Sequence, residues 1–357
     1  MKFKYITLSM AIVAGAFTFS SCSNDEPDAP AVDPVAPAGL YIINEGNFQA
    51  SNSSLSFYDP TDGTVTNNLF RTANDVTLGD LAYSMTIHDD LGWVVVNNSG
   101  VVFAIDLETN KEKGRITNLT SPRFMHFISD TKAYITQLYD NRIAIVNPST
   151  YSITGYIDVP GMDASSGSTE MMVQVGKYVY VNCWSYQNSI IRINTETDRV
   201  DGSLTVNIQP KSIVLDRDNN IWALTDGGYY GSPYGHEAPH LMKIDTRNMT
   251  VALNLEMNLN DYTPILAING AGDQLYWICN DVYTMPVTST SLPDDPIIDS
   301  EGHYYYGMTV SPDDSNIYIA DAVDYVQTGK IHRYDAQGNF VSSFSVGVNP
   351  RGFCWRK

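Results

Sequence analysis

The sequence predicts an all-β protein folded as a seven-bladed β-propeller. A turn motif recurs seven times, about every 41–51 residues, and a short strand of alternating apolar residues lies before each copy. The C-terminal segment also has the pattern of an innermost blade strand, which would close the ring. No window of comparable length shows a sustained helical period. A repeat of this length, built from short strands, is typical of a propeller blade.

Each copy of the turn motif is a short apolar strand that ends in Asp or Asn. These residues suit a turn because their side chains accept hydrogen bonds from the backbone two residues further on. The copies lie at 57–60, 104–107, 145–148, 192–195, 243–246 and 333–336, with a degenerate seventh at 285–288.

A second strand is expected upstream of each turn, because aromatic and β-branched residues alternate there between Asp, Asn and Gly clusters. An innermost strand precedes it and connects to it through a tight turn, such as 216–220 or 311–315. The expected second strands include 93–96, 133–136, 179–182, 221–224, 275–278 and 317–320.

Closure of the ring follows from the two ends of the repeat region. Three innermost strands open with Pro and a basic residue, and the last of them, at 350–351, belongs to the C-terminal segment. Residues 39–44 instead have a second-strand pattern. We therefore infer that the C-terminal strand completes the blade that the N-terminal strand begins, which removes an open sheet edge. Seven blades over residues 39–357 give about 45 residues each.

The N-terminal 38 residues are expected to be a processing segment and a tether. A basic start is followed by an apolar run too short to span a bilayer, which needs about 20 residues. The run ends in Ser-Ser-Cys and resembles a bacterial lipoprotein signal, with residues 1–21 removed and Cys22 lipidated. An ordinary secretory peptide with an incidental cysteine is the alternative. Residues 22–38, rich in acidic residues and then in Ala and Pro, are interpreted as a lipidated flexible tether.

Composition limits the possible partners. The formal net charge is −19, and 43% of the residues are hydrophobic, enough for a substantial core. An acidic surface argues against nucleic acid or anionic lipid as a ligand and favours a neutral or basic partner. Contact with a membrane is expected through the lipid anchor only.

Catalytic and metal-binding motifs are not recognisable in the sequence. It has no nucleophile elbow, no phosphate-binding loop and no HExxH motif, and His236 and His240 share a Gly- and Pro-rich loop. We therefore expect a protein that is not an enzyme and has neither a cofactor nor a bound metal. Cys183, Cys279 and Cys354 are expected to be small buried hydrophobes, with a disulfide between two of them as the alternative.

One set of loops contains the candidate ligand-binding side chains. In a propeller, the loops that enter each innermost strand meet, on one face, the loops that leave each second strand. Here these loops are rich in aromatic and amide side chains, which suit a large ligand bearing amides or hydroxyls. Packing of many tyrosines between blades is the alternative. The candidate ligand contacts are Phe48, Tyr139, Trp184, Tyr186, Tyr229, Tyr230, His236, Asn280, Tyr304, Tyr305 and Tyr325.

Three basic residues are expected to surround the central opening on the same face. Arg123, Lys211 and Arg351 each follow the proline that opens an innermost strand. They could bind a phosphate or an acidic partner, or they could pair with neighbouring carboxylates.

The chain resembles a known family in three features. These are the Asn-Glu-Gly-Asn-Phe segment at 44–48, the lipoprotein leader with its acidic tag, and the Ser-Pro-Asp-Asp turn at 311–314. Together they resemble the surface-layer propeller lipoproteins of gut Bacteroides-type bacteria, and most of all the surface-exposed cobalamin-binding lipoproteins of that group.

The resemblance implies capture rather than chemistry. A protein of this kind would be lipid-anchored on the outer surface of the outer membrane. It would bind cobalamin or a related corrinoid with high affinity and deliver it to a TonB-dependent transporter.

Two other classes stay open. One is a glycan- or protein-binding propeller in another surface uptake complex, whose tyrosines would stack on sugar rings. The other is a propeller hydrolase or lactonase, which would need a metal held by Asp, Asn, Glu or His at the central channel.

Overall fold

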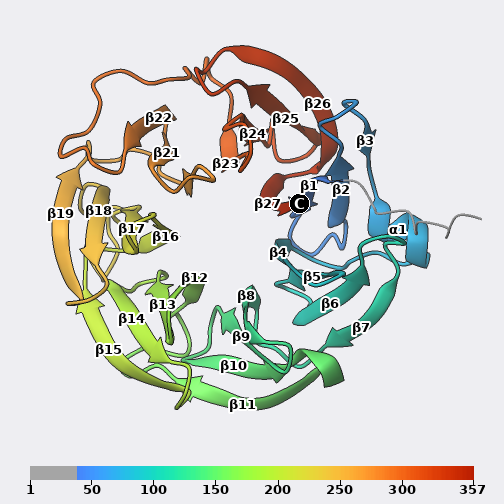
Figure 1. Cartoon of the computed structure of the whole chain (residues 1–357), viewed down its shortest axis with the longest axis horizontal. Helices are drawn as coiled ribbons and strands as arrows, with labels where there is room; N and C mark the ends of the chain where they lie inside the picture. The colour runs from blue at the N-terminus through green and yellow to red at the C-terminus, as the bar shows by residue number, and fades with distance from the viewer. Residues whose placement is uncertain (1–37) are drawn as a thin grey trace, which may run out of the picture. The chain divides into compact units, whose positions relative to one another are not determined.

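A computed structural model describes residues 38–357, and these residues form seven antiparallel sheets arranged in a ring (Figure 1). The predicted all-β, seven-bladed propeller is confirmed. The predicted signal peptide, Cys22 and nearly all of the tether lie outside the described residues. Within 38–357, no helix is long and apolar enough to cross a membrane.

Blades 1 to 4 each have four strands, named in order from the innermost outwards. Blade 1 consists of β27 (Pro350–Arg356), β1 (Gly39–Asn44), β2 (Ser54–Tyr58) and β3 (Val65–Thr66). Blade 2 consists of β4 (Ala82–His88), β5 (Leu91–Val96), β6 (Val101–Asp106) and β7 (Glu112–Ile116). Blade 3 consists of β8 (Pro122–Ser129), β9 (Lys132–Gln137), β10 (Arg142–Asn147) and β11 (Ser152–Asp158). Blade 4 consists of β12 (Thr169–Val175), β13 (Tyr178–Cys183), β14 (Ser189–Asn194) and β15 (Arg199–Thr205).

The remaining three blades differ in strand number. Blade 5 consists of β16 (Pro210–Leu215), β17 (Asn220–Thr225), β18 (His240–Asp245) and β19 (Thr250–Glu256). Blade 6 has only β20 (Leu266–Ile268), β21 (Gln274–Cys279) and β22 (Asp281–Pro286). Blade 7 consists of β23 (Tyr305–Val310), β24 (Ile317–Asp321), β25 (Thr328–Tyr334) and β26 (Phe340–Val348). Short helices are α1 (Leu69–Asn74), between β3 and β4, and the 3-10 helix η1 (Pro148–Thr150).

The ring closes as the sequence predicts. Strand β27 pairs antiparallel with β1, from Gly39 opposite Arg356 to Ile43 opposite Gly352. The C-terminal strand thus lies inside the strand with which the described residues begin (Figure 1). Both long edges of β1 are therefore paired, which leaves no open edge at the join between the chain ends.

Blade 6 lacks a fourth strand, and an extended linker at 287–304 follows β22 instead. The strand ends at Pro286, which cannot donate to a sheet ladder. The linker still touches the exposed edge of β22: the Val282 N–H donates to the Ile298 carbonyl at 2.9 Å, and the Ile297 N–H donates to the Val282 carbonyl at 2.8 Å. The degenerate seventh turn of the sequence pattern lies at this point.

A ring of buried aromatic side chains holds the blades together. In each blade, the second strand from the channel carries one of these residues, always at the same register. Its partner on the third strand lies two positions before the turn Asp or Asn, or two positions before Pro286 in blade 6. All seven are at most 3% exposed, and each belongs to a different apolar cluster between two neighbouring blades. Aromatic side chains bury about 150–250 Å² each, so this ring is a major part of the core. Its members are Tyr41, Trp93, Tyr134, Tyr180, Trp222, Tyr276 and Tyr318.

Candidate functional site

The loops that enter each innermost strand meet the loops that leave each second strand, and together they form one face, which we call the loop face. The same hydrogen bond joins them in every blade. The first N–H after the second strand donates to a carbonyl just before the innermost strand, as in Asp226 to Gln209 at 3.1 Å and Trp184 to Ser168 at 3.0 Å. The two sets of loops therefore share a rigid base of backbone hydrogen bonds.

Exposed aromatic side chains are concentrated on the loop face. Among residues 38–357, nine aromatic residues are at least 36% exposed. Two of them, Tyr156 and Phe340, lie on the outermost strands β11 and β26. The other seven lie in the loop-face segments: Phe48, Tyr139, Tyr229, Tyr230, Tyr234, Tyr262 and Tyr304. A surface of this kind can contact much of one side of a bulky ligand.

The tyrosines form two groups. In the first, over blades 4 and 5, the hydroxyls of Tyr186 and Tyr229 lie 3.2 Å apart, and the ring of Tyr186 lies 4.8 Å from that of Tyr234. In the second, over blades 6 and 7, Tyr304 lies 5.9 Å from Tyr262 and 5.2 Å from Tyr325, measured between ring centroids. Tyr306 lies 5.6 Å from Tyr325 and extends this group towards the central channel.

A hollow of about 340 Å³ lies between the β17–β18 loop of blade 5 and the segment that enters blade 6. We call it the tyrosine hollow. Four residues predicted as ligand contacts line it, namely Lys211, Tyr229, Tyr230 and His236, together with residues that were not predicted. Its lining includes Lys211, Asp226, Tyr229, Tyr230, His236, Asp261 and Tyr262.

A β-bulge directs one side chain from each innermost strand towards the channel, except in the short strand β20. In blades 1, 2, 5 and 7 one extra residue interrupts the pairing just after the strand begins. Blades 3 and 4 have the same irregularity, where two residues lie opposite one. Bulges of this kind re-aim side chains. The residues at these bulges include Tyr83, Arg123, Glu170, Lys211, Tyr306 and Arg351.

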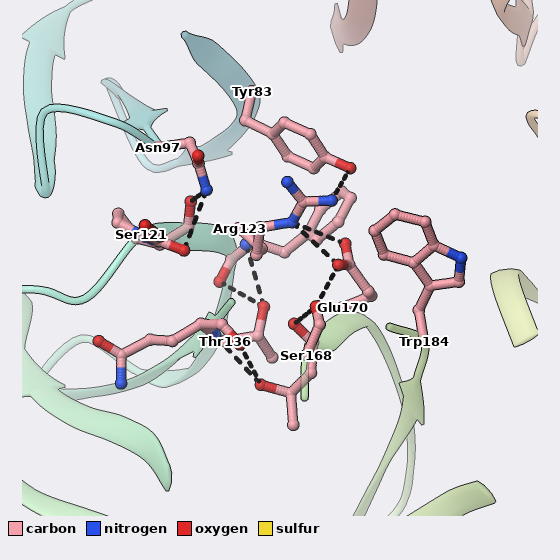
Figure 2. A network of polar contacts seen from close by, with 12 residues as sticks. Tyr83, Asn97, Ser121, Arg123, Thr136, Ser168, Glu170 and Trp184 are labelled. Atoms are coloured by element: carbon pink, nitrogen blue, oxygen red, sulfur yellow. Dashed lines mark hydrogen bonds and ion pairs between the residues drawn. The ribbon is translucent and has the colours of Figure 1, made fainter. Parts of the chain in front are cut away.

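Arg123 lies in a buried network and is 7% exposed (Figure 2). Its Nε donates to both carboxylate oxygens of Glu170, at 2.9 and 3.0 Å, and its Nη2 donates to the Tyr83 hydroxyl. The Ser168 hydroxyl donates to the same carboxylate, and the guanidinium lies 3.6 Å from the Tyr83 ring centroid. For Arg123 the structure therefore shows the pairing with a carboxylate that the sequence analysis left as an alternative.

Arg351 continues this network around the channel. It donates to the hydroxyls of Tyr83 at 2.8 Å and Tyr306 at 3.1 Å, and it lies 3.6 Å from Glu45. The Tyr306 hydroxyl donates to Glu45 at 2.7 Å. Burial raises the pKa of Tyr83 to about 12, although both guanidinium groups oppose the shift. The two arginines are thus joined through one neutral phenol.

Lys211 is bound less firmly than either arginine. Its Nζ lies 3.7 Å from Asp226 Oδ2, beyond hydrogen-bonding distance, and within residues 38–357 it donates no hydrogen bond. Asp226 instead accepts from Trp184 Nε1 at 2.7 Å, from Gln209 at 3.1 Å and from its own loop. Burial lowers the pKa of Lys211, while the Asp226 carboxylate opposes that shift. Lys211 lines both the tyrosine hollow and a cavity of about 390 Å³ in the central channel.

The other predicted contacts are dispersed. Tyr305 is 2% exposed and lies in the core, where its hydroxyl is 3.1 Å from that of Tyr334, so the assignment of Tyr305 to the ligand surface is wrong. Phe48 and Tyr139 are exposed on the loops of blades 1 and 3, outside the tyrosine hollow. Asn280 lines a neighbouring, carboxylate-rich hollow of about 420 Å³.

Several site residues escaped the sequence analysis. Tyr262 lies in the short segment that enters blade 6, and its position before an innermost strand is the signal that could have identified it. Tyr83, Glu170 and Tyr306 occupy the bulge position that Arg123, Lys211 and Arg351 occupy in other blades. They lack the preceding proline that marks those three in the sequence.

Solved structures similar to this chain share its fold. A quinonprotein alcohol dehydrogenase-like protein from Bacteroides thetaiotaomicron has a TM-score of 0.66 at 12% identity, covering 90% of this chain and 78% of that one. Kuenenia stuttgartiensis hydrazine synthase gives 0.59 at 15% identity, covering 76% and 88%. Apo AztD from Citrobacter koseri gives 0.55 at 12% identity, covering 89% and 98%. At these identities the likeness concerns the fold alone.

The sequence comparisons assign a family. No curated protein matches the sequence. One family model, described as a domain of unknown function, matches residues 38–349, which is nearly the whole propeller. The chain therefore belongs to the family named domain of unknown function DUF5074.

Proposed function

We propose that the protein captures cobalamin, or a related corrinoid, on its loop face. It would be held on the outer surface of the outer membrane by a lipid on Cys22, and it would pass the ligand to a TonB-dependent transporter. The choice of cobalamin as the ligand, and of a TonB-dependent transporter as the partner, comes from the family resemblance in the sequence. The structure supports the proposal through the composition and rigidity of the loop face.

One observation carries the binding proposal: seven of the nine exposed aromatic residues lie on one face, next to a hollow that contains an incompletely paired lysine. Cobalamin is large and presents a ring of amide side chains and one phosphate. Tyrosine rings and hydroxyls suit its apolar edges and amides, and Lys211 suits the phosphate. Because the loops are fixed by backbone hydrogen bonds, little ordering cost would oppose binding.

A glycan-binding role is the second candidate. Tyr230 is 91% exposed and Tyr229 is 49% exposed, so these rings could stack on sugar faces. A hydrolase with a metal at the channel mouth fits less well, because each carboxylate there already lies beside a basic side chain. Glu170 is paired with Arg123, Glu45 lies 3.6 Å from Arg351 and Asp226 lies 3.7 Å from Lys211.

Calorimetric titration of the purified protein with cyanocobalamin tests the proposal. We expect saturable binding of one equivalent, weakened in Tyr229→Ala and unchanged in Tyr156→Ala, which removes an exposed tyrosine from the outermost strand β11. Binding of a glycan with no cobalamin binding would leave the loop face as the ligand surface but refute the choice of ligand. Equal losses in both variants would refute the role of the loop face.

A further inference from the structure

Three side chains with metal-binding groups meet in blade 7, away from the central channel. His303 comes from the end of the 287–304 linker, Asp321 from the last position of β24, and His332 from β25. His303 Nδ1 lies 2.8 Å from Asp321 Oδ2, and His332 Nε2 lies 3.3 Å from the same oxygen. One ligand atom from each residue lies within 4.8 Å of the other two.

The three residues differ in exposure in a way that suits an ion bound from the surface. The side chains of Asp321 and His332 are 3% and 9% exposed, whereas that of His303 is 45% exposed. The Val323 N–H donates to Asp321 Oδ1 at 2.8 Å, which fixes the carboxylate with its other oxygen, Oδ2, towards both imidazoles.

A hollow of about 520 Å³ adjoins the cluster. His303 and His332 both line it, and so do Asp299 and Glu301 from the same linker. The open side of the cluster therefore has room for water, and two more carboxylates lie on the same hollow. The residues that complete its wall include Tyr305 and Tyr334 from the blade itself.

We propose that His303, Asp321 and His332 bind a divalent transition-metal ion, and that Zn²⁺ is the ion whose ligand preferences they match best. Two imidazole nitrogens and one carboxylate oxygen are a common three-residue zinc set, with the fourth position left to water. In tetrahedral zinc sites with bonds of about 2.0–2.1 Å, neighbouring ligand atoms lie about 3.3 Å apart. The two imidazole nitrogens lie 2.8 and 3.3 Å from Asp321 Oδ2, so a small adjustment of the exposed His303 would open the site to the ion. Ca²⁺ and Mg²⁺ prefer sets made of oxygen alone.

The ion would connect two parts of the propeller. His303 belongs to the linker that replaces the missing fourth strand of blade 6, whereas Asp321 and His332 belong to blade 7. Bound metal would thus fasten the linker to blade 7. The next residue, Tyr304, belongs to the second tyrosine group, so the ion would also fix that part of the loop face.

Metal analysis and titration of tag-free protein test this proposal. After treatment with a chelator and dialysis, titration with ZnCl₂ should show one equivalent bound, and Co²⁺ should give the visible absorption of a tetrahedral site. Bound Zn²⁺ should also raise the melting temperature, because only the folded chain presents the site.

Variants locate the ion. His303→Ala removes an exposed ligand, so it should fold normally yet weaken zinc binding about 100-fold or more, beyond the loss typical of indirect partners. Asp321→Asn should act in the same direction. The matched control is His88→Ala, from a second cluster with Asp89 and Asp130 that contains one histidine and two exposed carboxylates. The proposal is overturned if wild-type protein binds no zinc, if His303→Ala binds it undiminished, or if His88→Ala removes it.

Discussion

The ammonium group of Lys211 lies 3.7 Å from the Asp226 carboxylate and 4.9 Å from the centroid of the Trp184 ring. Trp184 donates to that carboxylate at 2.7 Å and so takes the place that the lysine would occupy in a close ion pair. The indole and the carboxylate thus position the lysine at the boundary between the tyrosine hollow and the channel. The three N–H donors of its ammonium group remain available to a ligand.

We therefore predict that Lys211→Met weakens ligand binding by at least about tenfold while the protein keeps or slightly gains stability. Burial lowers the pKa of Lys211, which means that folding costs free energy whenever the lysine is protonated. Removing the charge removes that cost. Calorimetric titration with cyanocobalamin and thermal melts check the two parts, and a large drop in melting temperature would show that the lysine is structural instead.

The Arg123–Glu170 pair should behave as a buried salt bridge. Glu170→Gln leaves a buried guanidinium without its counter-charge, so we expect a loss of about 3–5 kcal/mol in the free energy of unfolding. The double variant Arg123→Met/Glu170→Gln should lose less than either Glu170→Gln or Arg123→Met alone, because neither charge remains unpaired. Urea unfolding of the four proteins measures this cycle. Additive losses would mean that the two groups do not interact.

Tyr83 should make stability fall at high pH. Its pKa is raised from about 10 in the unfolded chain to about 12, so its contribution is complete below pH 10 and is lost as the pH rises through 12. Over that interval the free energy of unfolding should decrease by about 2–3 kcal/mol on account of this group. Tyr83→Phe should show a shallower decrease between pH 10 and 12. An identical slope in urea-unfolding measurements would exclude this effect.

The ring of buried aromatics should dominate stability, and the exposed tyrosines should not. Trp222→Ala empties a fully buried site between blades 5 and 6, so we expect a loss of about 3–5 kcal/mol. Tyr230→Ala changes a side chain that is 91% exposed and should stay within about 0.5 kcal/mol. Comparable losses in denaturant unfolding would show that Tyr230 packs against the protein in solution.

The repeat itself made the fold predictable. The turn Asp or Asn recurs at the same point of six blades, so the turns and strands could be predicted without coordinates. The Pro-basic start that the C-terminal strand shares with two other innermost strands predicted the closure of the ring. Blade 6 departs from the pattern at Pro286, where the ladder stops. The sequence marked this only as a degenerate copy of the turn.

The site was less predictable because bulges break the alternation of strand side chains. Three consecutive tyrosines at the start of blade 7 have three different environments: Tyr304 is exposed, Tyr305 is in the core and Tyr306 faces the channel. A period of two cannot yield this order, and the bulge between Tyr305 and Gly307 is the reason. The cluster around Asp321 was missed because its histidines lie 18 and 11 residues away in the sequence. The pairing of β24 with β25 brings His332 close to Asp321, and the linker that enters blade 7 brings His303.

The most direct test of the central claim is the calorimetric titration of wild type, Tyr229→Ala and Tyr156→Ala with cyanocobalamin. If the loop face binds the ligand, wild type and Tyr156→Ala should bind one equivalent with equal affinity, and Tyr229→Ala should bind at least about tenfold more weakly with an unchanged melting temperature. Absence of heat at micromolar concentrations of wild-type protein would contradict the choice of cobalamin. Undiminished binding by Tyr229→Ala would contradict the proposed position of the site.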